Sequence, residues 1–379
     1  MIARSIEKQI VNDYNKGKII VLTGARQVGK TTLYDQLSAN GGRVLRLNCD
    51  NFDDRDTLSH RTTTELATLL NGYDIAIIDE AQRVPDIGLS LKMIADLHLP
   101  TQVLVTGSSS LALYSKINEP ATGRLFEYNL YPLSLSELYQ HSSYREEHRL
   151  LEHRMIYGLY PEVVTHPEDA KRLLNGIANN YLYKDLLEYK GVRKSDLLQR
   201  LVCALALQVG SEVSYNELAN TLGVDKCTVE NYIGLLEQCF VVFRLPSYST
   251  NQRNEIKKGK KVYFYDNGIR NALISNFAPL NLRNDVGPLW ENLLVSERVK
   301  RNRYSRSYAK LYFWRNVQQQ EVDLIEEEDG RLKAYEFKWN KNNRVKPPMS
   351  FSTLYPEALF EVVTKENYHD FVSILNSTF

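Results

Sequence analysis

The stretch KIIVLTGARQVGKT, residues 18–31, decides the fold of this chain. The apolar, β-branched run at 18–23 predicts a buried parallel strand. Residues 24–31 follow it directly and fit the pattern G-x-x-x-x-G-K-[ST] without a mismatch, and a helical pattern continues to Leu37. Strand, glycine-rich loop and helix therefore stand in the order of a phosphate-binding loop.

The residue types in this loop have the chemistry that a nucleoside triphosphate needs. Glycines let backbone N–H groups curl around phosphates, and the helix that follows adds the positive end of its dipole. Lys30 supplies a charge for the β- and γ-phosphates, and Thr31 supplies a hydroxyl that can ligate Mg²⁺. We therefore predict an ATP site, with Lys30 also catalytic, formed by Gly24, Ala25, Arg26, Gln27, Val28, Gly29, Lys30, Thr31 and Thr32.

A second strand pattern ends in two acidic residues. Residues 74–80, DIAIIDE, form an apolar run that closes on Asp79 and Glu80. We predict that Asp79 holds the Mg²⁺ and that Glu80 polarises the water that attacks the γ-phosphate. An isolated loop motif can occur by chance on a surface turn, and this acidic strand argues against that alternative.

Two further candidates follow the third predicted strand, Gln102 to Thr106. Its position after the acidic strand resembles the sensor strand of additional-strand ATPases, so Ser108 or Ser109 is a candidate contact for the nucleotide. The alternative is a serine-rich turn. Arg124 is a candidate arginine finger or inter-domain sensor, and a solvated surface arginine is the alternative interpretation.

These motifs together carry a family resemblance. The strings GARQVGKTT, IIDEAQRVPD and VTGSSS, followed by Gly123-Arg124, resemble the prokaryotic AAA-superfamily ATPases that carry a C-terminal domain of unknown function. The resemblance implies an α/β fold with an additional-strand, AAA-like P-loop NTPase sheet, a helical lid, a winged helix and a restriction-endonuclease-like α/β domain. The implied bounds are 1–135 for the ATPase core, 136–195 for the lid, 196–268 for the winged helix and 269–379 for the nuclease-like domain.

The middle of the chain shows helical spacing and then the pattern of a winged helix. From Leu133 onward Glu, Leu and Tyr recur at helical intervals, as a helical lid requires. Ser214 begins a capped helix that stops at Gly223, and Asp225 begins a second helix, which predicts a helix-turn-helix pair. Strands predicted at 240–245 and 261–265 complete the winged helix.

The loop between these two strands is basic and is a candidate wing for contacting DNA phosphates. The alternatives are a solvated loop and a winged module that only packs on the ATPase core. Glu230 and Glu237 on the predicted recognition helix weaken the DNA interpretation. The basic residues are Arg253, Lys257, Lys258, Lys260 and Lys261.

Residues 321–338 predict a β-hairpin with an Asp-Gly turn. Its register places Asp323 opposite Glu336 and Glu321 opposite Lys338. Strand alternation puts these four side chains on one ionic face and apolar side chains on the other. Two carboxylates across a ladder repel each other, and a divalent cation would reverse that repulsion.

This hairpin resembles the PD-(D/E)XK nuclease pattern. The resemblance implies that Asp323 and Glu336 hold Mg²⁺, that Lys338 helps activate the hydrolytic water, and that all three are catalytic. Glu291 matches the additional acid of that family and is the third expected metal ligand. Two alternatives stay open: a polar sheet face stabilised by a Glu321–Lys338 pair, and a nuclease fold that has lost turnover.

Composition bounds the class of protein. At 379 residues the chain is too long for one core, and its net charge of +1 attracts neither nucleic acid nor membranes except through local patches. Four separated cysteines without a C-x-x-C pair argue against a zinc site and a disulfide framework. No stretch approaches the roughly 18 apolar residues of a membrane helix. We expect a cytoplasmic protein without membrane contact.

We expect a Mg²⁺-dependent ATPase that couples its nucleotide cycle to a DNA-binding module, with a second Mg²⁺ or Mn²⁺ at a nuclease-like site. The alternative is an ATP-driven regulatory switch that binds a protein partner and carries a silent nuclease-like domain. A third alternative, an ATP-binding scaffold with negligible turnover, has no need of Glu80. Association into a homo-oligomer also stays open.

Overall fold

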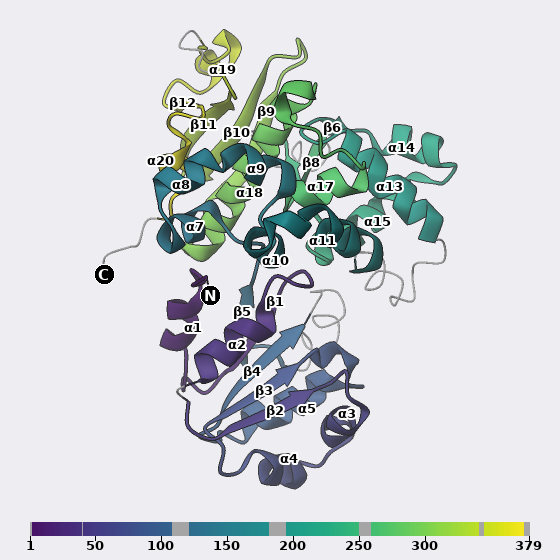
Figure 1. Ribbon diagram of the computed structural model, residues 1–379, viewed down its shortest axis with the longest axis vertical. Coiled ribbons are helices and arrows are strands. Elements are labelled where there is room, and N and C mark those ends of the chain that lie inside the picture. Colours follow the sequence, from purple (N-terminus) through teal and green to yellow (C-terminus); the bar gives the residue numbers. More distant parts are fainter. Residues whose placement is uncertain are drawn as a thin grey trace. The chain divides into compact units, whose positions relative to one another are not determined.

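The computed structural model describes residues 2–39, 41–107, 121–181, 195–249, 259–340 and 345–374 (Figure 1). These residues divide into two compact units. The first comprises the described residues up to Pro132 together with 238–240, and the second comprises the remainder. Across the described ranges, no helix is long and apolar enough to cross a membrane.

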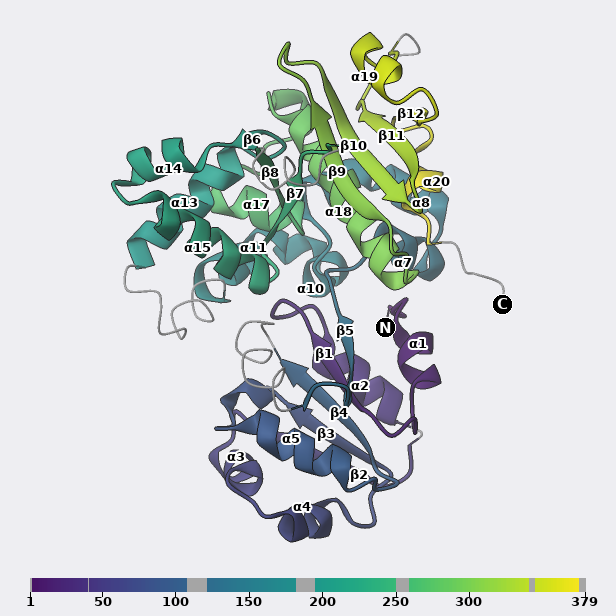
Figure 2. The same cartoon turned by 180° about the vertical axis from the view of Figure 1, so that it is seen from behind.

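The first unit contains a parallel sheet with helices on both faces (Figures 1 and 2). Its strand order is β2-β3-β4-β1-β5, so that β4 lies between β1 and β3. This order confirms the additional-strand arrangement predicted from the sequence. The strands are β1 (Ile19–Thr23), β2 (Val44–Asn48), β3 (Ile75–Asp79), β4 (Gln102–Gly107) and β5 (Leu125–Asn129).

The core of the first unit lies between this sheet and the helices that cover it. β1 is buried along its whole length, as expected of a central strand covered on both faces. Leu58, Leu66 and Leu91 from three helices pack against strand residues in one apolar cluster. The helices are α1 (Glu7–Asn12), α2 (Lys30–Ser38), α3 (Phe52–Leu58), α4 (Thr63–Leu70) and α5 (Ile87–Asp96), with a 3₁₀ turn η1 (Ala81–Arg83).

In the second unit, helices α17 (Asn267–Leu273) and α18 (Val286–Tyr304) hold the segments that precede them in the chain. Asn267 Nδ2 donates to the Met155 carbonyl (3.1 Å), and Glu297 accepts the Leu135 N–H (2.8 Å). The described part of the predicted lid therefore packs within the second unit. Its elements are α7 (Leu135–His141), α8 (Tyr144–Arg149), α9 (Leu151–Tyr157), α10 (Pro161–Thr165), η2 (Pro167–Asp169), α11 (Ala170–Gly176) and the π-helical η3 (Ile177–Tyr181).

The second unit also contains a small antiparallel sheet, in the order β6-β8-β7, and two consecutive helices, α14 and α15, that are joined by a short turn. Helix α14 begins after Ser214, which accepts the Glu217 N–H, and ends at Gly223 with φ +69°. Asp225 then accepts the Thr228 N–H (2.8 Å), so the predicted caps are confirmed. The elements are α13 (Ser195–Leu207), β6 (Glu212–Val213), α14 (Tyr215–Leu222), α15 (Lys226–Gln238), β7 (Val242–Pro246) and β8 (Lys260–Phe264).

The C-terminal sheet has the order β12-β11-β10-β9, and the predicted register of its central hairpin is confirmed from Glu328–Arg331 to Leu324–Tyr335. The two predicted pairs of charged residues, Asp323–Glu336 and Glu321–Lys338, lie beyond these paired positions. Glu328 pairs with Arg331 across a turn in which Asp329 and Gly330 both have positive φ, as a type I′ turn requires. The elements are η4 (Leu280–Leu282), β9 (Lys310–Arg315), β10 (Glu321–Glu328), β11 (Arg331–Phe337), α19 (Met349–Leu354), β12 (Leu359–Val363) and α20 (Tyr368–Val372).

The predicted separation of this hairpin into one ionic and one apolar face is wrong. The pairing of β10 with β9 shifts between Val322 and Ile325, and these two residues pack in the same apolar cluster. A β-bulge of this kind interrupts strict alternation. Glu326 is also buried, where its carboxylate accepts from Asn302 Nδ2 (2.7 Å). Both faces of β10 therefore carry polar as well as apolar side chains.

Candidate functional site

The loop between β1 and α2 needs glycine at both ends. A Cβ atom on Gly24 would lie only 2.1 Å from the carbonyl oxygen of Leu130. Gly29 has φ +94° and stands directly before Lys30, the first residue of α2. The N-terminus of α2 therefore closes the loop, where the free amides and the helix dipole favour an anion.

Lys30 lies folded into this loop. The residue is 6% exposed, and its Nζ donates to the carbonyl oxygens of Gly24 (2.9 Å) and Ala25 (2.8 Å). The ammonium group is thus held inside the turn whose amides would wrap the phosphates, which is the place its predicted role requires.

The structure brings Thr31 and Asp79 together from two different elements. Thr31 Oγ1, on the first turn of α2, donates to Asp79 Oδ2 at the end of β3 (2.8 Å). A hydroxyl and a carboxylate are hard oxygen donors of the kind that Mg²⁺ prefers. The residues present therefore fit the magnesium ion predicted from the sequence.

Thr106 is a site residue that the sequence analysis missed. Its buried hydroxyl, on β4, donates to Asp79 Oδ1 and accepts the Glu80 N–H (3.1 Å). Glu80 itself has φ +51°, and its carboxylate accepts from the Gln82 side chain. The signal was a polar residue inside the apolar run QVLVTG, whereas the prediction chose Ser108 or Ser109, which lie outside the described residues.

Arg124 lies at the N-terminal ends of the parallel strands, whereas the phosphate-binding loop lies at their C-terminal ends. Its carbonyl accepts the N–H of Ile19, the first residue of β1, and β1 runs parallel to β5. The Arg124 side chain pairs with Asp96 through two contacts of 2.5 and 3.1 Å. Arg124 is therefore remote from the loop of its own chain, and a catalytic role would require a second copy.

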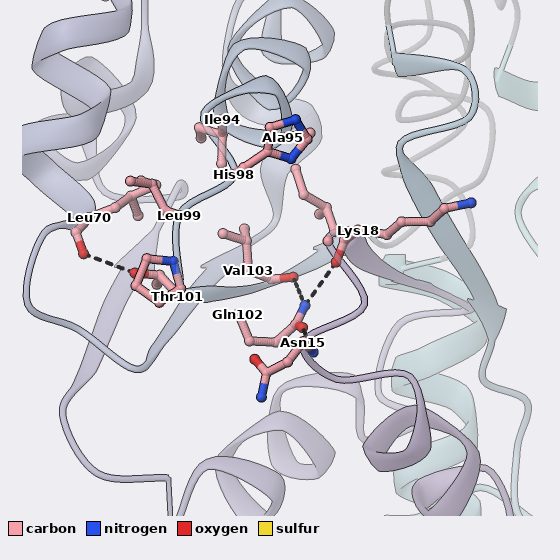
Figure 3. A pocket seen from close by; sticks show the side chains of 13 residues that line it. Asn15, Lys18, Leu70, Ile94, Ala95, His98, Leu99, Thr101, Gln102 and Val103 are labelled. Carbon is pink, nitrogen blue, oxygen red and sulfur yellow. Dashed lines mark hydrogen bonds between the residues drawn. The ribbon is translucent and has the colours of Figure 1, made fainter.

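A cavity of about 400 Å³ lies at these same N-terminal ends of the strands (Figure 3). It is lined by residues that precede β1, by the end of α5 and by the start of β4. Figure 3 shows Gln102 Nε2 donating to the carbonyls of Lys18 and Val103, each at 3.1 Å. Its lining, as far as the structure describes it, contains no predicted site residue, so we do not assign the nucleotide to it.

A second group of candidate residues lies in the second unit, where three carboxylates meet. Glu291 comes from α18, whereas Glu321 and Asp323 come from β10, and one oxygen atom of each lies within 4.8 Å of the others. Such an oxygen set suits Mg²⁺ or Mn²⁺. Two of the predicted metal ligands, Glu291 and Asp323, are thus brought together, and Glu321 joins them.

Lys261, on β8, contacts two of these three carboxylates. Its Nζ lies 2.9 Å from Glu291 Oε1 and 2.5 Å from Glu321 Oε1, and the side chain is 1% exposed. The prediction that Lys261 contacts DNA phosphates as part of a wing is therefore wrong, because a buried ammonium that holds two carboxylates cannot reach a ligand. The neighbouring positions 250–258 lie outside the described residues.

The remaining predicted residues, Glu336 and Lys338, form an ion pair beside this group. Lys338 Nζ lies 2.7 Å from Glu336 Oε1, so the alternative Glu321–Lys338 pair does not form. The Phe337 N–H donates to Asp323 Oδ2 (2.8 Å). Burial first, and then the charges of Glu291 and Glu336, raise the pKa of Asp323 well above its usual value. A cation bound here would relieve that crowding of negative charge.

Comparison with known families divides the chain into three segments. Residues 16–139 match a family described as an AAA domain. Residues 148–280 and 286–375 match two domains of unknown function, DUF8612 and DUF4143 respectively.

Individual relatives extend over most of the chain. An uncharacterized protein of Mycobacterium tuberculosis (strain ATCC 25618 / H37Rv) is 27% identical over 330 residues, covering 86% of this chain and 71% of that protein. An uncharacterized protein of Haemophilus influenzae is 25% identical over 340 residues, covering 84% and 82% respectively. Among solved structures, a Walker-type ATPase of Pyrococcus abyssi shows 14% identity and a TM-score of 0.49, covering 72% of this chain and 96% of that one.

The matched segment at 16–139 contains the phosphate-binding loop and the strand that ends in Asp79. It also contains all five strands of the parallel sheet, with β4 inserted between β1 and β3. Family match, sheet order and loop geometry agree, and residues 16–139 are therefore an AAA-type, P-loop ATPase-like domain.

Proposed function

We propose that this chain hydrolyses ATP at the phosphate-binding loop in a Mg²⁺-dependent reaction. The observation that carries the proposal is the 2.8 Å contact between Thr31 Oγ1 and Asp79 Oδ2, beside Lys30 and Glu80. A loop that only bound a phosphate would need neither the acidic strand nor a base next to it.

Each residue has a role that its position supports. Lys30 would exchange its two carbonyl partners for phosphate oxygens, and the N-terminus of α2 would add its amides. Glu80 would orient the attacking water and accept its proton, while Thr106 fixes Asp79 and the Glu80 backbone. Mg²⁺, when bound, neutralises charge on the phosphates as the γ-phosphoryl group departs.

The test is phosphate release from ATP, with and without EDTA. We expect Lys30→Ala to abolish turnover, because the phosphates lose their cation, and Glu80→Gln to bind ATP without hydrolysing it. Lys8→Ala, which changes an exposed lysine outside the loop, is the matched control. Normal turnover in both active-site variants would remove the mechanism.

We further propose that the second unit binds DNA and carries a nuclease-like metal site whose activity depends on the nucleotide cycle. The pair of helices α14 and α15 beside the β7–β8 strands supports a winged helix. The carboxylates of Glu291, Glu321 and Asp323 support a site for Mg²⁺ or Mn²⁺. Glu336 and Lys338 stand next to that site, where the nuclease-like pattern places its acid and its lysine.

Cleavage of single- and double-stranded DNA with Mg²⁺ or Mn²⁺, with and without ATP, tests this part. We expect Asp323→Ala, Glu336→Ala and Lys338→Ala each to remove cleavage, and Glu357→Ala, which changes an exposed acid, to leave it intact. The alternative function is an ATP-driven switch that binds a protein partner. The burial of Lys261 among the carboxylates favours that alternative, and absence of cleavage by the wild type under every condition would establish it as the better proposal.

A further inference from the structure

Arg4, which precedes α1, makes a buried bridge within the first unit. Its Nη1 donates to the Val28 carbonyl and its Nη2 to the Tyr131 carbonyl, each at 2.7 Å, and the residue is 8% exposed. Val28 belongs to the phosphate-binding loop, whereas Tyr131 lies two residues beyond the end of β5. The guanidinium group therefore joins the loop to the segment by which the chain leaves the sheet.

The bridge acts on the carbonyl side of the loop. When backbone N–H groups turn toward phosphates, the carbonyl groups turn away from them and need donors of their own. Lys30 serves the carbonyls of Gly24 and Ala25, and Arg4 serves that of Val28. Phosphates would draw Lys30 away from its carbonyls, whereas Arg4 is anchored at Tyr131 and would stay.

The segment leaving the sheet touches the other end of the loop as well. The Leu130 N–H donates to the Thr23 carbonyl (2.7 Å), and the Leu130 carbonyl packs directly on Gly24. Thr23 Oγ1 donates to Asn129 Oδ1 (2.8 Å). Residues 129–131 thus contact the start of the loop directly and its Val28 carbonyl through Arg4, immediately before Pro132, where the first unit ends.

We propose that Arg4 is a positioning residue of the nucleotide site, and that through it nucleotide binding sets the conformation of residues 129–132. The inference rests on the proposed binding of ATP. A guanidinium group is planar and donates in a fixed fork, so it holds two carbonyls in one arrangement. A shift of Val28 on phosphate binding would therefore be passed to Tyr131 and to the chain that follows it.

The experiment combines two measurements on the full chain. A fluorescent ADP analogue gives the dissociation constant, and hydrogen exchange reports the amides of residues 129–131 and 133 with and without ADP. In the wild type we expect ADP to slow exchange there. In Arg4→Met we expect affinity to fall about tenfold, because two charge-assisted hydrogen bonds are lost, and the slowing of exchange to disappear.

Two further variants separate positioning from general stability. Arg61→Met removes an arginine of the same unit whose Nη2 also donates to a carbonyl, that of Asp56, and we expect it to leave both measurements unchanged. Arg4→Lys keeps a charge without the fork, so we expect an intermediate affinity and no effect of ADP on exchange. It also serves if Arg4→Met does not fold.

The outcomes are distinct. Wild-type affinity together with retained ADP-dependent protection in Arg4→Met or Arg4→Lys would overturn the inference, even if the melting temperature fell. A wild-type chain that binds no ADP would overturn the proposed function first, and the inference with it. Equal losses in Arg61→Met would show a merely structural effect and would also overturn it.

Discussion

Lys261 is a buried lysine whose partners come from two other elements of the second unit. It contacts Glu291 on α18 and Glu321 on β10, and Tyr263, two residues further along β8, donates to the same Glu291 oxygen (2.5 Å). Burial alone lowers the pKa of Lys261, but the carboxylates of Glu291, Glu321 and Asp323 raise it above its usual value. The residue therefore serves as a permanent counter-ion.

Replacing this lysine tests its role. We expect Lys261→Met to destabilise the second unit by about 3 kcal/mol, because two carboxylates lose their shared cation. Urea unfolding followed by tryptophan fluorescence measures the loss selectively, since all three tryptophans, Trp290, Trp314 and Trp339, belong to that unit.

The matched control for this measurement is Lys338→Met. The Lys338 side chain is 41% exposed and pairs with Glu336, and a pair whose ammonium group remains open to solvent contributes up to about 1 kcal/mol. Equal losses of unfolding free energy in the two variants would show that burial of Lys261 does not increase the contribution of its ion pairs to stability.

At the scale of elements, the junction of α17 with α18 depends on one carboxylate. Asp285, just before α18, accepts from Arg270 Nη1 on α17 (2.5 Å) and from Arg283 Nε (2.7 Å). Burial alone raises the pKa of Asp285, but hydrogen bonds from these two arginines lower that pKa to about 2. Its ionised form is therefore bound more strongly in the folded chain than in the unfolded chain.

This shift predicts an acid-dependent loss of stability. A carboxyl with a lowered folded pKa contributes stability above its unfolded value, 3.8, and that contribution is lost as the pH falls from there toward about 2. We expect Asp285→Asn to be less stable than the wild type near neutral pH and to lose less on acidification. Parallel pH profiles of the urea midpoint would contradict the assignment.

The sequence predicted some of the elements and side-chain positions of the two sites but not others. The phosphate-binding loop was predictable because one contiguous stretch encodes strand, loop and helix, and the hairpin register followed from its Asp-Gly turn. The cluster of Glu291, Glu321 and Asp323 was predicted only in part. A bulge between Val322 and Ile325 breaks the alternation on which face assignment depends, and Lys261 comes from a distant strand. Thr106 was missed because its partner Asp79 lies on another strand, 27 residues earlier in the chain, and the local signal was a single polar residue in the run QVLVTG.

At the scale of the whole molecule, Arg124 raises the question of association. It pairs with Asp96 at the ends of the strands opposite the phosphate-binding loop, so it cannot serve the nucleotide of its own chain. A finger acting on a second copy is the catalytic role that this position leaves.

Mixing the Arg124→Ala and Lys30→Ala chains tests that role. We expect Arg124→Ala to slow hydrolysis only at protein concentrations where protomers associate. A mixture with Lys30→Ala should recover part of the activity, because the second variant supplies Arg124 and the first supplies an intact loop. Rates of Arg124→Ala equal to the wild type at every concentration would leave Arg124 as a surface residue.

The hydroxyl of Thr106 has a consequence for how this domain tolerates sequence variation. Its single proton is donated to the Asp79 carboxylate at the end of β3, and its oxygen accepts the backbone N–H of Glu80, so one atom on β4 positions both residues. Position 106 therefore requires a hydroxyl that can both donate and accept a hydrogen bond, and side-chain volume alone does not meet this requirement. Serine can therefore replace Thr106, whereas valine, which has nearly the same volume, cannot, and substitutions at positions 79 and 106 should covary among relatives.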